Sequence, residues 1–201
     1  LFNYLTGYSA KKEYRKLLVA PVNLRQGIEA LIDKEIEHQH KNGNGRLIFK
    51  MNSLVDPLMI RKLYRASKAG VKVDLIVRGM CCLRPGVPGV SDNIRVFSVV
   101  GRFLEHSRVF YFYNGGSEQI YLGSADLMPR NINHRVEVLF PVQDNRIIRY
   151  LRDDVLQTYL IANVKIRQMN ADGSYTRVTQ ATGEPAINPQ EWLIHHRQRK
   201  I

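Results

Sequence analysis

Residues 103–126 read FLEHSRVFYFYNGGSEQIYLGSAD. This pattern predicts a β-hairpin, with an apolar strand that carries His106 and Arg108, a Gly-rich turn at residues 114–116, and a second strand that ends in Gly-Ser at residues 123–124. Residues two apart in a strand point to the same face, so His106 and Arg108 are expected to aim at one spot. A histidine can bond to phosphorus or exchange a proton, and an arginine can hold the phosphate oxygens beside it. The hairpin therefore indicates phosphoryl chemistry.

The chain before the hairpin alternates strand and helix patterns with short connections. This order is typical of a parallel α/β sheet, in which ligands gather beyond the carboxyl ends of the strands. Asn52 and Arg78 each follow an expected strand, and we expect both at that edge. The expected strands cover residues 16–21, 46–51, 71–77, 94–100 and 136–140, and the expected helices begin after Asn23, at Asp56-Pro57 and at Asp144.

Two parts of the chain differ in composition. Residues 1–162 carry the strand and helix patterns of a compact domain, whereas residues 163–201 are polar and basic and predict an extended arm. The neighbouring His195 and His196 in that arm are attributed to a solvated tail, with a metal site as the alternative. Residues 80–93 are rich in Gly and Pro and predict an ordered loop or a lid.

The chain carries a large excess of positive charge. Its 201 residues include 30 Lys and Arg against 18 Asp and Glu, which gives a formal net charge of +12. Such an excess predicts a polyanionic partner: nucleic acid, an anionic membrane or inorganic phosphate chains. The alternative is a basic surface that serves solubility or faces an acidic domain. No apolar run approaches the roughly 20 residues that a membrane span needs.

Two further features bear on the origin of the chain. Cys81 and Cys82 are adjacent, so they form neither a disulfide framework nor a spaced metal pair, which favours a reducing cytoplasm. Peripheral association with a membrane is a further option for so basic a chain. The start, LFNYLTGYSAKKEYRK, has no initiator Met and lacks the apolar core of a signal peptide. We expect a piece of a longer protein.

The motifs of the hairpin resemble the HKD signature of the phospholipase D superfamily. That signature reads H-x-K and, after a spacer, G-S-x-N. The corresponding residues here are His106-Ser107-Arg108 and Gly123-Ser124-Ala125-Asp126, so Arg stands in place of Lys and Asp in place of Asn. The aspartate of the signature has no counterpart, since Tyr113 and Asn114 occupy its usual place. These departures argue against an ordinary phosphodiesterase.

A longer part of the chain resembles the C-terminal catalytic region of bacterial polyphosphate kinases of the long-chain-synthesising type. The resemblance rests on NSLVDPLMIRKLYRASKAGVKVDLIVRGMCCLRPGVPGVSDNIRVFSVVGRFLEHSRVFYFYNGG and SADLMPRNINHRVEVLFPV, at residues 52–116 and 124–142. It extends from LFNYLTGYS to EWLIHH and so covers most of the chain. It implies a phospholipase D-like α/β domain with a central mixed sheet flanked by helices. It also implies an enzyme that uses Mg²⁺ and transfers the terminal phosphate of ATP reversibly to polyphosphate through a phosphohistidine.

The resemblance also assigns roles to residues. In this family two phospholipase D-like domains face each other, and each contributes one histidine. The phosphorylated histidine lies upstream of this chain, and His106 matches the second, which exchanges a proton with the phosphoryl group. Arg78 matches the arginine that binds the nucleotide phosphates. We add Arg108, Arg130 and Arg135 as a basic lining for the polyanion, and we expect the ligands of Mg²⁺ outside this chain.

The implied partners are ATP or ADP, inorganic polyphosphate and the remaining domains of the full kinase, in a homo-oligomer without a membrane span. The isolated chain holds half an active site and is expected to be inactive. Two competing functions stay open: a phosphodiesterase or nuclease with the same histidine geometry, and a non-catalytic polyanion-binding module, which the charge favours. His134 is expected to be structural.

Overall fold

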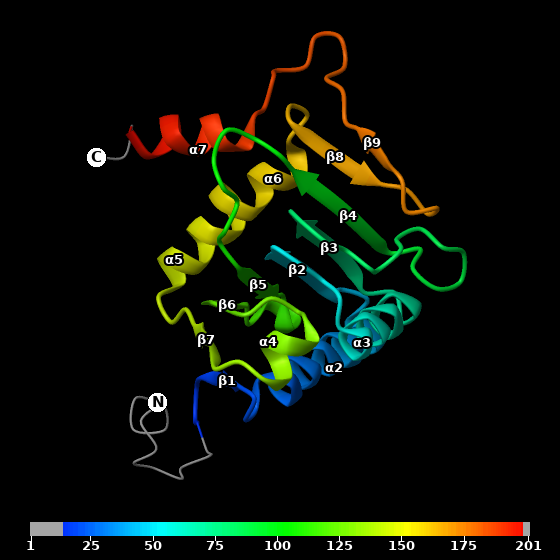
Figure 1. Ribbon diagram of the computed structural model, residues 1–201, viewed down its shortest axis with the longest axis vertical. Coiled ribbons are helices and arrows are strands. Elements are labelled where there is room, and N and C mark those ends of the chain that lie inside the picture. Colours follow the sequence, from blue (N-terminus) through cyan, green and yellow to red (C-terminus); the bar gives the residue numbers. More distant parts are fainter. Residues whose placement is uncertain (1–13, 199–201) are drawn as a thin grey trace.

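The computed structural model describes residues 14–198 (Figure 1). Within that range, nine strands form one sheet in the order β1-β7-β6-β5-β2-β3-β4-β8-β9. The amino-terminal pattern at residues 1–13, and Arg199 and Lys200 of the expected tail, lie outside the described residues. The strands are β1 (Leu18–Ala20), β2 (Arg46–Met51), β3 (Lys72–Val77), β4 (Ile94–Val99), β5 (Val109–Phe112), β6 (Gln119–Gly123), β7 (Glu137–Pro141), β8 (Ile166–Met169) and β9 (Tyr175–Arg177).

The centre of the sheet is parallel. β2 pairs with β3 from Arg46↔Lys72 to Met51↔Val77, and β3 pairs with β4 in the same sense. The other neighbouring strands are antiparallel, which makes the sheet mixed. The predicted α/β fold is therefore confirmed, and the carboxyl ends of β2 and β3 meet at one edge, where Asn52 and Arg78 follow them.

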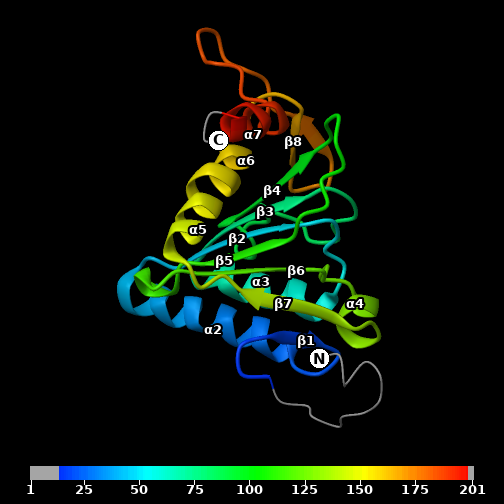
Figure 2. The same ribbon diagram turned by 90° about the vertical axis from the view of Figure 1, so that its left-hand side faces the viewer.

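Helices cover both faces of the sheet, as Figure 2 shows. On one face lie α2 (Leu24–Asn42) and α3 (Pro57–Lys68), and on the other lies a continuous helical segment made of α5 (Asn145–Arg149), η2 (Tyr150–Leu156) and α6 (Gln157–Ile161). The two faces hold separate apolar clusters. Each fully buried Leu, Ile or Phe in them stabilises the fold by about 1.5–3 kcal/mol.

The starts of the first two helices differ from each other. Asp56 begins α3 as predicted, because its side chain accepts hydrogen bonds from the backbone N–H groups of Leu58 and Met59. α2 begins after Asn23 as predicted, but Asn23 forms no side-chain capping hydrogen bond with the helix. Its side-chain oxygen turns back to accept from the backbone N–H of Val19 at 2.6 Å, so it ties β1 to the helix start.

The predicted hairpin is confirmed as the antiparallel pair β5–β6. The prediction that His106 and Arg108 lie in its first strand is wrong, since β5 begins only at Val109. The register ends at Lys50↔Val109, and the preceding residues form a loop without strand pairing. Residues 100–108 are called the histidine loop below. Glu105 and Ser107 in this loop both bind the buried Lys50. The loop therefore lacks the alternation of buried and exposed side chains that is typical of a strand.

Within residues 163–201, for which the sequence predicts an extended arm, the described part includes β8, β9 and a helix. β8 pairs with β4 and β9 pairs with β8, so the segment widens the sheet. Ile166 and Met169 are 1% and 5% exposed, and this burial explains the pairing in an otherwise polar sequence. The chain then reaches α7 (Pro189–Gln198). The proposed boundary at residue 162 stays a prediction. Residues 14–198 contain no helix with the length and apolar character needed to cross a membrane.

Candidate functional site

A cleft with a volume of about 470 Å³ opens at the edge where β2 and β3 end. All five residues singled out in the sequence line it. They come from separate parts of the chain: Arg78 from the end of β3, His106 and Arg108 from the histidine loop, and Arg130 and Arg135 from α4 (Pro129–Asn133) and the residues after it. The fold thus brings four guanidinium groups and one imidazole around a single space.

Arg108 is held in place by Asp126. Its Nε and Nη2 donate to the two carboxylate oxygens of Asp126, each at 3.0 Å. Asp126 also accepts from the backbone N–H of Asn52 at 2.8 Å. Both side chains of the pair are nearly buried, at 11% and 9% exposure. The positive charge of Arg108 is therefore largely compensated, and its orientation is fixed by a two-point contact.

Arg108 also orients His106. Its Nη1 donates to the carbonyl oxygen of His106 at 3.2 Å and lies 3.4 Å from Nδ1 of the imidazole. A guanidinium group can only donate, so a hydrogen bond between these atoms requires Nδ1 to accept. In the neutral imidazole the hydrogen then sits on Nε2. In this tautomer the Nε2–H group can donate a hydrogen bond to a group bound in the cleft.

A buried ion pair anchors the histidine loop to the protein interior. Lys50, 2% exposed, lies 2.9 Å from a carboxylate oxygen of Glu105 and donates to the Ser107 hydroxyl at 2.9 Å. Burial lowers the pKa of Lys50, and Glu105 opposes that effect. Burial would raise the pKa of Glu105, but Lys50 and hydrogen bonds from Gln190 and Tyr159 hold it below its ordinary value. The two residues that flank His106 are thus anchored in the interior.

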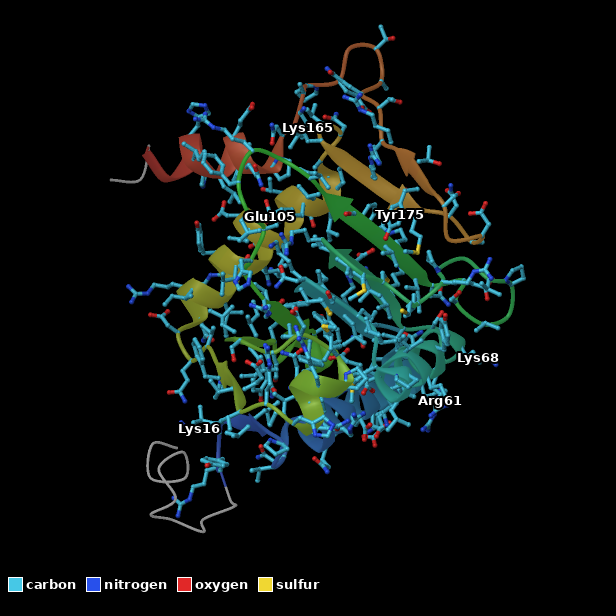
Figure 3. All side chains as sticks on the ribbon, viewed as in Figure 1. Lys16, Arg61, Lys68, Glu105, Lys165 and Tyr175 are labelled. Atoms are coloured by element: carbon cyan, nitrogen blue, oxygen red, sulfur yellow. The ribbon has the colours of Figure 1, made fainter. Side chains whose placement is uncertain are left out.

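Helix α7 holds the other end of the histidine loop. Gln190 accepts from the backbone N–H of Phe103 at 2.9 Å and donates to its carbonyl oxygen at 2.8 Å. The same amide lies 2.6 Å from Glu105. A Cβ at Gly101 would lie 2.3 Å from Oε1 of Gln190, so any larger residue there would push the Gln190 amide out of its position. Figure 3 shows Glu105 on the loop between the sheet and the helices of the C-terminal part.

The remaining arginines are free to meet a ligand. Nε of Arg78 is buried and forms no hydrogen bond with the described residues, and a buried donor of this kind calls for a partner. Arg130 and Arg135 are exposed, and none of the ion pairs found in residues 14–198 involves either of them. His134 is exposed and does not line the cleft.

Four residues of this arrangement were not predicted: Asp126, Lys50, Glu105 and Gln190. A signal existed for Asp126, because Arg and Asp replace the Lys and Asn of the HKD pattern and are complementary in charge. Lys50 is the one charge within the apolar run LIFKM. Gln190 has no signal in the sequence, since its partner lies 87 residues away.

The described residues do not fit a magnesium ion by themselves. They contain no group of three or more His, Cys, Asp or Glu side chains placed to hold a metal. Both oxygens of Asp126 bind Arg108, and Glu137 accepts from Asn131 at 2.7 Å. The expectation of Mg²⁺ with ligands outside this chain stays a prediction.

The family model and the similar known sequences that match this chain point to the same family. A family model described as polyphosphate kinase C-terminal domain 2 matches residues 17–190. The chain is 56% identical over 200 residues to a polyphosphate kinase of Prosthecochloris aestuarii and 53% identical over 200 residues to polyphosphate kinase 1 of Chlorobaculum tepidum. All of this chain is covered in both matches, but it spans only 28% of the length of each relative.

Comparison with solved structures agrees with the sequence matches. The crystal structure of a polyphosphate kinase from Porphyromonas gingivalis matches with a TM-score of 0.94 and 38% identity, covering 99% of this chain and 30% of that one. Nuc from Salmonella typhimurium, a phospholipase D family member, matches with a TM-score of 0.56 and 13% identity, covering 77% of this chain and 97% of that one. This second match shows a shared fold only, and it confirms the predicted phospholipase D-like architecture. The chain belongs to the polyphosphate kinase C-terminal domain 2 family.

Proposed function

We propose that this chain supplies one half of the active site of a polyphosphate kinase, an enzyme that transfers the terminal phosphate of ATP reversibly to inorganic polyphosphate. The observation that carries the proposal is the convergence of His106 and four arginines on one cleft. Family membership supports it. Phosphoryl transfer depends mainly on positioning and on positive charge around the equatorial oxygens, and guanidinium groups supply both.

The proposed reaction has two steps. First, the bond between the terminal phosphorus of ATP and its bridging oxygen breaks, a P–N bond to a nucleophilic histidine elsewhere in the protein forms, and ADP leaves. Then the P–N bond breaks, and a terminal oxygen of polyphosphate bonds to the phosphorus. Mg²⁺ would neutralise phosphate charge when bound, with its ligands supplied from outside this chain.

His106 acts in this scheme as a proton donor and acceptor to phosphate oxygens, not as the nucleophile. Arg108 supports the role by fixing the imidazole, because its Nη1 lies against Nδ1 and the His106 carbonyl oxygen and leaves Nε2 as the ring nitrogen that can meet a phosphate oxygen. Arg78 binds the nucleotide phosphates, since its Nε is a buried donor without a partner in the described residues. Arg130 and Arg135 line the same cleft and bind the polyanion.

The test is the rate of ATP-dependent polyphosphate synthesis by the full-length protein. We expect His106→Ala to lower kcat by about 10²–10⁴-fold, and Arg78→Ala by roughly 10²–10³-fold. Arg61→Ala, an exposed position on α3, is the control and should retain the normal rate. Near-normal rates in the first two variants would refute the assigned roles. The 201-residue chain alone should make no polyphosphate, because it lacks the nucleophile.

A phosphodiesterase or nuclease is the alternative, and the phospholipase D-like fold is its only support. The replacement of the Lys and Asn of the HKD pattern by the Arg108–Asp126 ion pair argues against it. Hydrolysis of single-stranded DNA by the full-length protein, lost in His106→Ala, would favour this alternative. A polyanion-binding module without catalysis would bind polyphosphate but show no turnover. A homo-oligomeric, cytoplasmic kinase stays a prediction.

A further inference from the structure

Two further hollows adjoin the cleft, at the carboxyl end of β4 and the amino end of β8. The first has a volume of about 560 Å³ and is lined by residues 78–79 and 99–104, so it shares Arg78 with the cleft. The second, of about 200 Å³, is lined by Val100, residues 165–167 and Arg177, so it shares Val100 with the first. Shared wall residues therefore link the space around His106 to the β8–β9 pair.

The walls of both hollows carry cations and no carboxylate. Arg102 contributes to the first hollow, and Lys165, Arg167 and Arg177 contribute to the second. All four residues are exposed, and none of the ion pairs found in residues 14–198 involves any of them. We call these four residues the basic track. Figure 3 shows Lys165 at the start of β8, and its carbonyl oxygen accepts from the N–H of Val100 in the histidine loop.

Two cations of the basic track lie directly opposite each other and repel in the absence of an anion. Arg167 and Arg177 are direct partners across the antiparallel β8–β9 pair, so their side chains leave the same face. Like charges directly opposite each other destabilise a sheet. Lys165 has a φ of 60°, a left-handed conformation that is uncommon for lysine. A bound anion would remove the repulsion between the two arginines.

The lining of the first hollow beside Arg78 and Arg102 is mainly apolar. It is formed largely by aliphatic side chains, including Val99, Val100 and Leu104. Walls of low dielectric constant focus the field of the charges that line them. The guanidinium of Arg102 lies over the ring of its neighbour Phe103, 5.3 Å from the centroid, which fixes the charge at the wall.

We propose that the basic track is a second binding site for inorganic polyphosphate, which holds the distant part of a long chain while its end lies in the cleft. This inference rests on the proposed function. A repeating anion fits because the cations continue beyond the cleft into two further hollows, a longer path than three phosphates need. Single-stranded nucleic acid, whose bases would stack on aromatic side chains, is the competing ligand, and the test below separates it from polyphosphate.

The test compares two charge-matched triple variants of the full-length protein. Lys165→Gln/Arg167→Gln/Arg177→Gln removes three cations of the track. Lys41→Gln/Arg61→Gln/Lys68→Gln removes three exposed cations from α2 and α3, and Figure 3 shows Arg61 and Lys68 on α3, away from Lys165. The dissociation constants of long-chain polyphosphate, tripolyphosphate and single-stranded DNA are measured over a range of salt concentrations.

We expect the track variant alone to weaken the binding of long-chain polyphosphate. The slope of the logarithm of its affinity against the logarithm of the salt concentration should become shallower by about 2, because each of the three lost phosphate contacts removes roughly 0.7 from the slope. Binding of tripolyphosphate should not change, because three phosphates do not extend beyond the cleft. Unchanged long-chain binding, an equal loss in the control variant, or a larger loss for DNA than for polyphosphate would each overturn the proposal. The result does not depend on turnover, so a failure of the proposed catalytic roles would be seen separately in His106→Ala.

Discussion

Arg108 and Asp126 form a two-point ion pair at the base of the cleft, with both N–O distances at 3.0 Å. The positions correspond to the Lys and Asn of the HKD pattern, so the two departures from that pattern compensate each other. We expect Asp126→Asn to lower the free energy of unfolding by about 3 kcal/mol, because it leaves a nearly buried guanidinium without its counter-charge. Chemical denaturation of the full-length protein measures this loss.

A double variant tests whether the pair is the cause. Arg108→Lys together with Asp126→Asn restores the Lys and Asn of the HKD pattern. This double variant has the same net charge as Asp126→Asn alone. The double variant should be more stable than the sum of the two single effects predicts. Strict additivity of the three unfolding free energies would contradict a direct coupling.

Gln190 is expected to act as a positioning residue for His106. Gln190→Ala removes two hydrogen bonds to the backbone of Phe103 and one to Glu105. The histidine loop should then lose its fixed position, and kcat should fall by roughly 10–100-fold with little change in the KM for ATP. Steady-state kinetics of polyphosphate synthesis separates the two constants.

The same contact can be broken from its other side. Gly101→Ala places a methyl group against the Gln190 amide and should reproduce the kinetic effect. Glu191→Gln, an exposed neighbour on α7, should leave kcat unchanged. A fall in the thermal unfolding temperature of Gln190→Ala without a change in kcat would mean that the residue serves stability only.

The ionisation of Glu105 should make the free energy of unfolding depend on pH. Its pKa is lower in the folded protein than in the unfolded chain, because Lys50 and the hydrogen bonds from Gln190 and Tyr159 outweigh the effect of burial. Its contribution is therefore complete above the ordinary glutamate pKa of about 4.3 and is lost as the pH falls through the folded value. The stability difference between wild type and Glu105→Gln should be constant near neutral pH and shrink in acid. Urea titrations at several pH values test this, and a difference that grows in acid would contradict it.

Cys81 and Cys82 should react very differently. Burial raises the pKa of Cys81 to about 11, and its thiol donates to the carbonyl oxygen of Leu83 at 3.6 Å. The thiolate is the reactive form, so Cys81 should resist iodoacetamide at neutral pH. Cys82 is exposed and should be alkylated first. Peptide mass spectrometry locates the label, and modification of Cys81 in the folded protein would contradict the burial.

Local patterns predicted the scaffold well. Runs such as Lys72–Val77 combine β-branched residues with burial on both faces, and the apolar stripe of α2 repeats at helical spacing. The cap at Asp56 is a local signal too. The fold class and the edge of the sheet that carries Arg78 follow from these patterns.

The histidine loop could not be predicted from local patterns, because its conformation depends on distant partners. FLEHSRVFYF alternates like a strand, but Lys50 draws Glu105 and Ser107 inward and so ends the strand pairing. β8 was missed for a similar reason. Its four residues, IRQM, carry two polar side chains, and they form a strand because they pair with β4.

The bonds between Gln190 and the histidine loop also set an order of events during synthesis. All nine strands of the sheet formed by residues 14–198, the last of which ends at Arg177, leave the ribosome before α7 does. The contact with Phe103 spans 87 residues and cannot close before residue 190 is free. The histidine loop therefore gains this support only after every strand of this sheet has been synthesised.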